Sequence, residues 1–140
     1  MSTIFSKILS GEIPASFVYR DDKVAAFMDI QPVNPGHVLI VPISPVQFLY
    51  ELDDQSCQHL MKVAKAVSKA IRNSGIKCEG INLFLADGES AGQEVAHVHL
   101  HVFPRYAGDG FGLKFSERYS QLPPRAELEA AAEKIRGVLE

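Results

Sequence analysis

The sequence has few cysteines, little net charge and no long hydrophobic run. Only two of its 140 residues are cysteine, and Cys57 and Cys78 lack CxxC spacing, which excludes a disulfide framework and fits a reducing compartment. The net charge of −3 argues against a general electrostatic grip on nucleic acid or anionic membrane. The start lacks the regions of a signal peptide, and no apolar run reaches membrane-spanning length. We therefore expect a cytoplasmic domain that binds neither nucleic acid nor membrane.

The length and composition suit one domain spanning residues 1–140. Hydrophobic residues make up 46% of the chain, and no long polar low-complexity tract or internal repeat interrupts it. A chain of this length buries a real core but is too short for two independent cores.

Hydrophobic periodicity and turn signals predict five strands and three helices. Strands are expected at Ser16–Arg20, Lys23–Ile30, His37–Pro42, Gly80–Ala86 and Ala96–Arg105. Helices are expected at Ile4–Leu9, from Asp53 to near Gly75, and from about Pro124 onward. The inward face of the long helix should hold Cys57, Leu60, Met61, Ala64, Val67 and Ile71, and that of the last helix Leu128, Ala131, Ile135 and Val138. Because short turns join most of the strands, the arrangement is an antiparallel α+β fold.

Three of the five histidines stand at alternate positions in the stretch GQEVAHVHLHVFPR. Alternate side chains of a strand share a face and lie roughly 6.6–6.8 Å apart along it. His97, His99 and His101 are therefore expected to point one way, and the apolar residues between them toward the core. The pattern predicts a titratable row on a rigid element.

Three interpretations of this row compete. The first is a solvated strand face that happens to be rich in histidine. The second is a metal site, since His-x-His on a strand is a common way to hold zinc. A structural site would need a fourth ligand, for which no paired cysteines are present, whereas a catalytic site could use Glu94 or the distant His37. The third is a site for phosphate transfer, and we favour it.

Imidazole chemistry supports phosphate transfer. Imidazole is a good nucleophile at neutral pH, and neighbouring rings serve as acids or hydrogen-bond donors. A central histidine that attacks phosphorus forms a covalent nucleotidyl-histidine and divides one difficult displacement into two easier ones. The preceding DGESAGQ turn adds Gly88 and Gly92, whose backbone N–H groups can approach an anion, and the side-chain donor Gln93.

The sequence resembles the histidine triad (HIT) family. The family motif is His-φ-His-φ-His-φ-φ, with φ apolar, and HVHLHVF at residues 97–103 matches it at every position. The segments TIFSKILSGEIP, VAAFMDIQPVNPGHVLIVP and DGESAGQ are similar to their family counterparts, so the likeness covers about residues 3–106, while about 114–140 forms a C-terminal extension without a match. The resemblance implies a five-stranded antiparallel sheet with a long helix, a homodimer whose sheets join, and hydrolysis or transfer at the α-phosphate of a nucleotide, often a purine one.

The resemblance also implies roles for polar residues. His99 would be the nucleophile, His97 would orient it, and His101 would contact the phosphate on the leaving-group side. His37 would complete the phosphate pocket. Asp29 would bind ribose hydroxyls, because a carboxylate accepts both hydrogen bonds.

Further matches concern the rest of the nucleotide. Gln93 matches a phosphate-side donor and Gly92 lies in the same turn. The side chains that would line the pocket for the base are Ile4, Phe5, Ile8, Phe27, Ile30 and Leu39. Without the resemblance these residues would be interpreted as ordinary hydrophobic core.

Several positions depart from the family pattern. Zinc-binding members have ligands where this chain has Thr3, Ser6 and Pro45, so we expect no metal site and no required cofactor, apart from magnesium accompanying a polyphosphate substrate. Ala86 replaces a frequent Asn or Gln. Glu94 replaces a hydroxyl residue that often meets the phosphate, and a carboxylate there repels phosphate unless it points away.

These observations predict a homodimeric nucleotide hydrolase or transferase that acts on a purine nucleotide phosphoramidate or acyl-adenylate through a nucleotidyl-histidine. A dinucleoside polyphosphate hydrolase is one alternative, and a weakly active nucleotide-binding regulatory module is another. A metal hydrolase is the remaining alternative.

Overall fold

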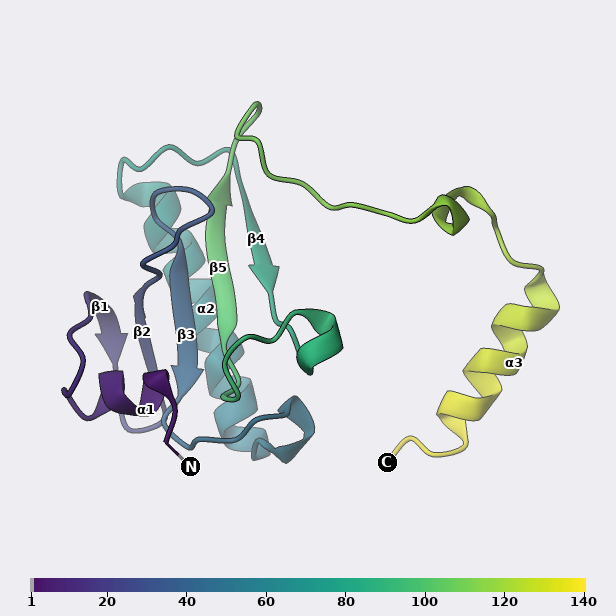
Figure 1. Cartoon of the computed structure of the whole chain (residues 1–140), viewed down its shortest axis with the longest axis horizontal. Helices are drawn as coiled ribbons and strands as arrows, with labels where there is room; N and C mark the ends of the chain where they lie inside the picture. The colour runs from purple at the N-terminus through teal and green to yellow at the C-terminus, as the bar shows by residue number, and fades with distance from the viewer. Residues whose placement is uncertain (1) are drawn as a thin grey trace. The chain divides into compact units, whose positions relative to one another are not determined.

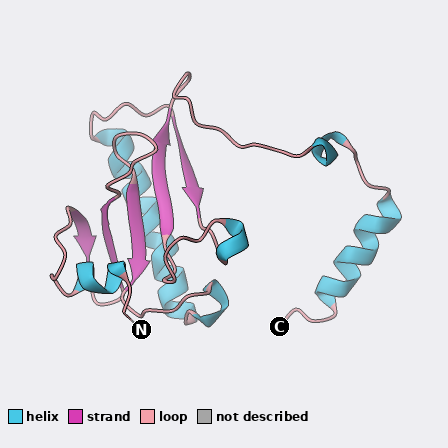
Figure 2. Ribbon diagram, in the orientation of Figure 1, coloured by secondary structure: helices cyan, strands magenta, loops and turns pink. Residues whose placement is uncertain are grey.

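A computed structural model describes residues 2–140 and divides the chain into two compact units, one ending at Asp109 and the other beginning at Gly110. The first unit contains helices α1 (Ile4–Leu9) and α2 (Asp54–Asn73), and the second contains α3 (Arg125–Arg136). Figure 1 labels these elements and Figure 2 colours them by type. Within residues 2–140, no helix combines the length and the apolar character needed to cross a bilayer.

The first unit is built on one five-stranded antiparallel sheet. Its strands are β1 (Phe17–Arg20), β2 (Val24–Met28), β3 (Val38–Pro42), β4 (Gly80–Phe84) and β5 (Leu100–Arg105). In space their order is β1-β2-β3-β5-β4, so β1 and β4 form the edges. The predicted α+β fold is confirmed.

The strand that carries the histidine row is shorter than predicted. β5 begins at Leu100, because the backbone before it bonds outside the ladder: the Val98 N–H donates to the Val46 carbonyl at 2.8 Å. His97 and His99 therefore precede the strand, and the prediction that all three histidines lie in it is wrong for these two.

Local capping explains where α1 forms. Thr3 is its N-cap, and the Thr3 hydroxyl oxygen accepts a hydrogen bond from the Ser6 N–H at 3.2 Å. The helix is followed by Gly11, whose φ of 85° suits a residue without a side chain. α1 buries Phe5 and Ile8 against the sheet.

An apolar face at helical spacing explains how α2 packs. Asp53 caps its start by accepting a hydrogen bond from the Ser56 N–H at 2.9 Å. The buried hydrophobic residues on the helix are Leu60, Val63, Ala64, Val67 and Ile71. Met61, which was predicted to face inward, is 57% exposed, and Val63 lies in the core instead.

The two faces of the sheet are covered differently. α2 packs on one face, where the strands contribute Val24, Ala26, Val38, Ile40, Leu100 and Val102 to the core. The other face carries α1 and a second apolar cluster that contains Ala25, Phe27, Leu39 and Val41. Figure 1 shows α2 behind the sheet and α1 in front of it. Because Leu39 pairs with His101 across β3 and β5, the histidine belongs to the α1 face.

The second unit, residues 110–140, contains α3 and a short 3₁₀ turn at Glu117–Ser120. The helix predicted near Pro124 is confirmed, with Pro124 as its N-cap. Its apolar residues were predicted to face inward, but Leu128, Ala131, Ile135 and Val138 are all exposed. This unit by itself supplies no second layer against which they could pack.

Candidate functional site

The three histidines of the row share one face, although only His101 belongs to the strand. The ring centroids of His99 and His101 lie 5.0 Å apart, and the Phe5 ring lies 5.0 Å from His99 and 5.7 Å from His97. The apolar residues between the histidines pack toward α2. The predicted common direction is thus present.

Hydrogen bonding determines which nitrogen of His99 is available for chemistry. The His99 Nδ1–H donates to the His97 carbonyl at 2.8 Å, so the neutral ring carries its lone pair on Nε2. Within residues 2–140, no fully buried side-chain nitrogen or oxygen lacks a partner. Since His99 Nε2 has no hydrogen bond, it reaches solvent. An imidazole held in this way presents an oriented nucleophile.

His97 supports the row from beneath. It is fully buried, its Nε2–H donates to the Pro42 carbonyl at 2.8 Å, and its Nδ1 accepts from the Thr3 hydroxyl at 3.3 Å. Burial lowers the pKa of His97, and the bond to Pro42 offsets this in part. A neutral ring with both nitrogens engaged fixes the backbone carbonyl that orients His99.

His37 and His101 form a directed hydrogen-bonded pair. The Val33 N–H donates to His37 Nδ1 at 2.9 Å, so the proton of the neutral His37 ring is on Nε2. That N–H donates to His101 Nδ1 at 2.9 Å, which leaves the proton of His101 on its outward Nε2. Burial lowers the pKa of both rings, that of His101 to about 4 with further contributions from His99 and His37. Both rings are therefore neutral at physiological pH.

Asp29 lies beside this pair and completes the set of side chains that could hold a metal ion. Its Oδ2 is 3.5 Å from His37 Nε2 and 4.0 Å from His101 Nδ1. A metal would need a lone pair on His37 Nε2, but the Val33 N–H keeps that lone pair on Nδ1. Two imidazole nitrogens bound tetrahedrally to zinc would also lie about 3.3 Å apart, farther than the 2.9 Å found here. The two rings are thus arranged as a hydrogen-bonded pair, and a metal would require His37 to give up the proton on Nε2.

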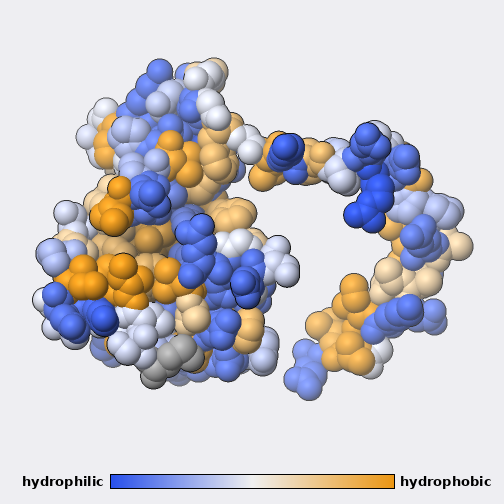
Figure 3. All heavy atoms as spheres, viewed as in Figure 1, coloured by the Kyte–Doolittle hydropathy of each residue, from blue (hydrophilic) through white to orange (hydrophobic). Residues whose placement is uncertain are grey.

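The apolar residues matched to the base divide into two groups. Phe5, Ile8, Phe27 and Leu39 are buried together in the cluster on the histidine face. Ile4 and Ile30 are 47% and 92% exposed. Figure 3 shows hydrophobic side chains, in orange, on this face of the first unit. The structure thus places four of the six in one apolar cluster, in which Phe5 contacts the histidines, and leaves the other two exposed.

The turn before the histidine row is held by Gln93. Its Oε1 accepts from the Gly88 N–H at 2.8 Å and its Nε2 donates to the Gln47 carbonyl at 2.9 Å. Gly92 has φ 97°, a conformation that strains any residue with a side chain. The Glu94 side chain is exposed. The Gln93 amide therefore shapes the turn and has one N–H left for a ligand.

One polar cluster outside the row was not found from the sequence. Asp21 Oδ2 accepts from the Tyr19 hydroxyl at 2.6 Å and from His59 Nε2 at 2.5 Å. Although burial raises the pKa of Asp21, the hydrogen bonds from Tyr19 and His59 hold it well below its ordinary value. Through this contact His59 ties α2 to the turn between β1 and β2. The pattern holds no signal for a contact between residues so far apart in sequence.

Known proteins match the chain over most of its length. A family model of the HIT domain matches residues 10–108. An uncharacterized HIT-like protein of Borreliella burgdorferi is 46% identical over 79% of this chain and 81% of its own. The purine nucleoside phosphoramidase of Escherichia coli is 38% identical over 71% of this chain and 84% of its own. A crystal structure of a HIT family member from Bacillus subtilis has a TM-score of 0.89 and 34% identity, and covers 100% of this chain and 99% of that one. The chain belongs to the HIT family.

Proposed function

We propose that the chain is a hydrolase or transferase that acts at the α-phosphate of a purine nucleotide conjugate through a covalent nucleotidyl-His99 intermediate. The observation that carries the proposal is the orientation of His99, whose Nδ1–H is bonded to the His97 carbonyl at 2.8 Å while Nε2 has no partner among residues 2–140 and is not fully buried. A nucleophile poised on a rigid segment beside hydrogen-bond donors is what such a displacement requires.

The reaction would run in two displacements. In the first, the lone pair of His99 Nε2 attacks phosphorus, the Nε2–P bond forms, and the leaving group departs with the electron pair and takes up a proton from solvent. In the second, water attacks the same phosphorus and gives up a proton to solvent, the P–Nε2 bond breaks with its electron pair returning to Nε2, and a nucleoside monophosphate is released. The outward Nε2–H of His101 would donate to a phosphoryl oxygen in both steps. Because the pKa of His101 is lowered to about 4, this ring acts as a neutral donor.

A phosphoramidate or an acyl-adenylate is our first choice of substrate. The similarity to the Escherichia coli purine nucleoside phosphoramidase supports the former. Both classes carry on the α-phosphate a group that can leave, a carboxylate directly and an amine once it is protonated. We assign the ribose hydroxyls to Asp29 and the base to the apolar side chains around Phe5. Dinucleoside polyphosphates are the second choice, with magnesium accompanying the phosphates that His99 does not attack.

We further propose a cytoplasmic homodimer that joins two sheets through β4. Strand β4 is a sheet edge, and its Leu83 and Phe84 are 45% and 44% exposed. An edge strand with exposed apolar side chains pairs readily with a second copy. Cys57 and Cys78 are free thiols, which supports a reducing compartment.

Trapping the intermediate tests the reaction. The protein is mixed with adenosine 5′-phosphoramidate labelled at phosphorus and denatured within milliseconds, and the label that remains on protein is measured. We expect a burst that approaches one label per chain in the wild type and no burst in His99→Gly. The burst should be retained in the control variant His59→Asn, because His59 lies outside the site. A wild-type protein that turns the substrate over without labelled protein would refute the covalent route.

A weakly active nucleotide-binding module is the second candidate. Ala86 is 4% exposed and offers no polar group where many relatives have one, and this favours weak activity. Tight binding of adenosine monophosphate, with neither a burst nor turnover across phosphoramidate, acyl-adenylate and dinucleoside polyphosphate, would support the module and refute the enzyme.

A further inference from the structure

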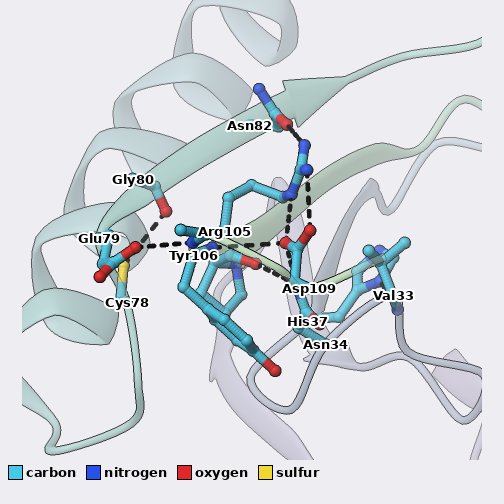
Figure 4. Close-up of polar contacts among 12 residues, drawn as sticks. Val33, Asn34, His37, Cys78, Glu79, Gly80, Asn82, Arg105, Tyr106 and Asp109 are labelled. Atoms are coloured by element: carbon cyan, nitrogen blue, oxygen red, sulfur yellow. Dashed lines mark hydrogen bonds and ion pairs between the residues drawn. The ribbon is translucent and has the colours of Figure 1, made fainter. Parts of the chain in front are cut away.

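The loop before β3 is pinned to the far end of β5 through Asn34. This side chain is buried, and both hydrogens of its amide are used: Nδ2 donates to the Pro104 carbonyl at 2.9 Å and to Asp109 Oδ2 at 2.8 Å. Figure 4 shows Asn34 and Asp109 facing each other beneath Arg105. The loop is therefore attached to a point only a few residues beyond His101.

Asp109 is itself held rigidly. The Arg105 Nε donates to Asp109 Oδ2 at 2.6 Å and its Nη2 donates to Oδ1 at 3.0 Å, a two-pronged ion pair. The Asp109 side chain is only 3% exposed. Arg105 also reaches β4, where its Nη1 donates to Asn82 Oδ1 at 2.7 Å. A carboxylate held by both oxygens gives Asn34 a fixed partner.

Hydrogen bonds connect this anchored loop to the histidines. The residue before Asn34 is Val33, whose backbone N–H donates to the ring nitrogen Nδ1 of His37. The backbone N–H of His37 donates to the Asn34 carbonyl at 3.2 Å. His37 Nε2–H in turn donates to His101 Nδ1. The Val33 bond has one allowed direction, because a backbone N–H cannot accept. It places the proton of the neutral His37 ring on Nε2, and this sets the direction of the His37–His101 bond.

We propose that Asn34 and Asp109 are positioning residues that set the ring tautomers of His37 and His101. By holding the loop against β5 they keep the Val33 N–H on His37 Nδ1, and His101 then presents an N–H to the phosphate. The inference rests on the proposed function for the role of that N–H, but the tautomers themselves are independent of it.

The opposite tautomers would reverse the chemistry. If the Val33 N–H moved away, the neutral His37 ring could carry its proton on Nδ1 and accept at Nε2. His101 would then donate from its Nδ1 and present a lone pair on its outward Nε2. A lone pair repels a phosphoryl oxygen, so the site would lose one donor, a change that costs about 10²–10³-fold in kcat in oxyanion sites.

The test uses Asn34→Asp, which keeps the shape of the side chain. It replaces both amide donors with acceptors and sets a carboxylate against that of Asp109. The matched control is Asn82→Ala, which removes a hydrogen bond from the same Arg105 on its other, exposed side. The tautomers are measured by long-range proton–nitrogen NMR of histidine-labelled full-length protein at a pH of about 8. The turnover of adenosine 5′-phosphoramidate is measured in parallel.

In wild-type protein and in Asn82→Ala we expect His37 and His101 both protonated at Nε2. In Asn34→Asp we expect signals of the Nδ1-protonated forms and a kcat at least about tenfold lower, with the control within about twofold. If the aspartate variant does not fold, the milder Asn34→Ala takes its place. A wild-type spectrum with His101 protonated at Nδ1 overturns the proposal whatever the variants do.

The two readouts separate this proposal from the proposed function. If the tautomers change in Asn34→Asp but the wild type does not turn over the phosphoramidate, the positioning role stands and the proposed function is refuted. Tautomers that stay unchanged in a folded Asn34→Asp, with an active wild type, refute the positioning role.

Discussion

Lowering the pH from about 8 to about 4 is expected to destabilise the first unit through His101. Burial, with the charges of His99 and His37, lowers the pKa of His101 from 6.5 to about 4, and Asp29 offsets this only in part. The side chain is 21% exposed, so little solvent screens it. Since one pKa unit corresponds to about 1.4 kcal/mol, the lowering corresponds to about 3 kcal/mol of stability.

The sign follows from which state binds the proton first. Above about pH 6.5 the His101 ring is neutral in both the folded and the unfolded state, and the full stability of about 3 kcal/mol is present. As the pH falls below 6.5, His101 becomes protonated in the unfolded chain but stays neutral in the folded protein, and the free energy of unfolding declines. The decline ends near pH 4, where the folded ring is protonated too.

Urea unfolding at a series of pH values measures this contribution. The comparison is with His101→Asn, in which an amide oxygen near the Nδ1 position can still accept from His37 Nε2–H. His37 and His97 also have lowered pKa values in the wild type, so only the difference between the two proteins isolates His101. We expect the wild type to lose about 3 kcal/mol more than the variant between pH 7 and pH 4. Two curves that stay parallel within about 0.5 kcal/mol would refute the reasoning.

Three further predictions concern the surroundings of the row. Thr3→Val removes the cap of α1 and the hydroxyl that donates to His97, so we expect a loss of about 1 kcal/mol in urea unfolding; an unchanged midpoint would contradict the capping role. Asp21→Asn removes the hydrogen-bonded carboxylate that chiefly raises the pKa of Tyr19, so spectrophotometric titration should show that pKa falling toward 10, and an unmoved titration curve would contradict the contact. A strong chelator is expected to leave turnover of a phosphoramidate unchanged, because the proton on His37 Nε2 opposes a metal; stoichiometric zinc with activity lost on chelation would overturn this.

Much of the fold follows from local patterns. The helical spacing of Leu60, Ala64, Val67 and Ile71 predicted the buried face of α2, because side chains three and four residues apart lie on the same side of a helix. Met61 shows the limit of this reasoning, since a residue at the border of the stripe turned outward. Local spacing cannot locate that border, which depends on how the helix sits on the sheet.

The histidine row was predictable as a row but not as a site. Alternation alone predicted that the three rings share one face, and they do so even though the ladder is absent before Leu100. The start of β5 depended on the hydrogen bond between Val98 and Val46, which are 52 positions apart. His37 meets His101 across 64 positions. No window of sequence holds both partners of either contact.

The sequence by itself thus determined that three imidazoles lie together on one face, because the alternation of histidine with apolar residues requires only the geometry of neighbouring peptides. The tertiary structure alone decided which nitrogen of each ring carries the proton. That choice follows from the partner each nitrogen finds: the His97 carbonyl for His99, and for His37 the Val33 N–H, on a loop anchored at Asp109. A tautomer is decided by hydrogen bonds across the fold, and these exist only once the chain has closed on itself.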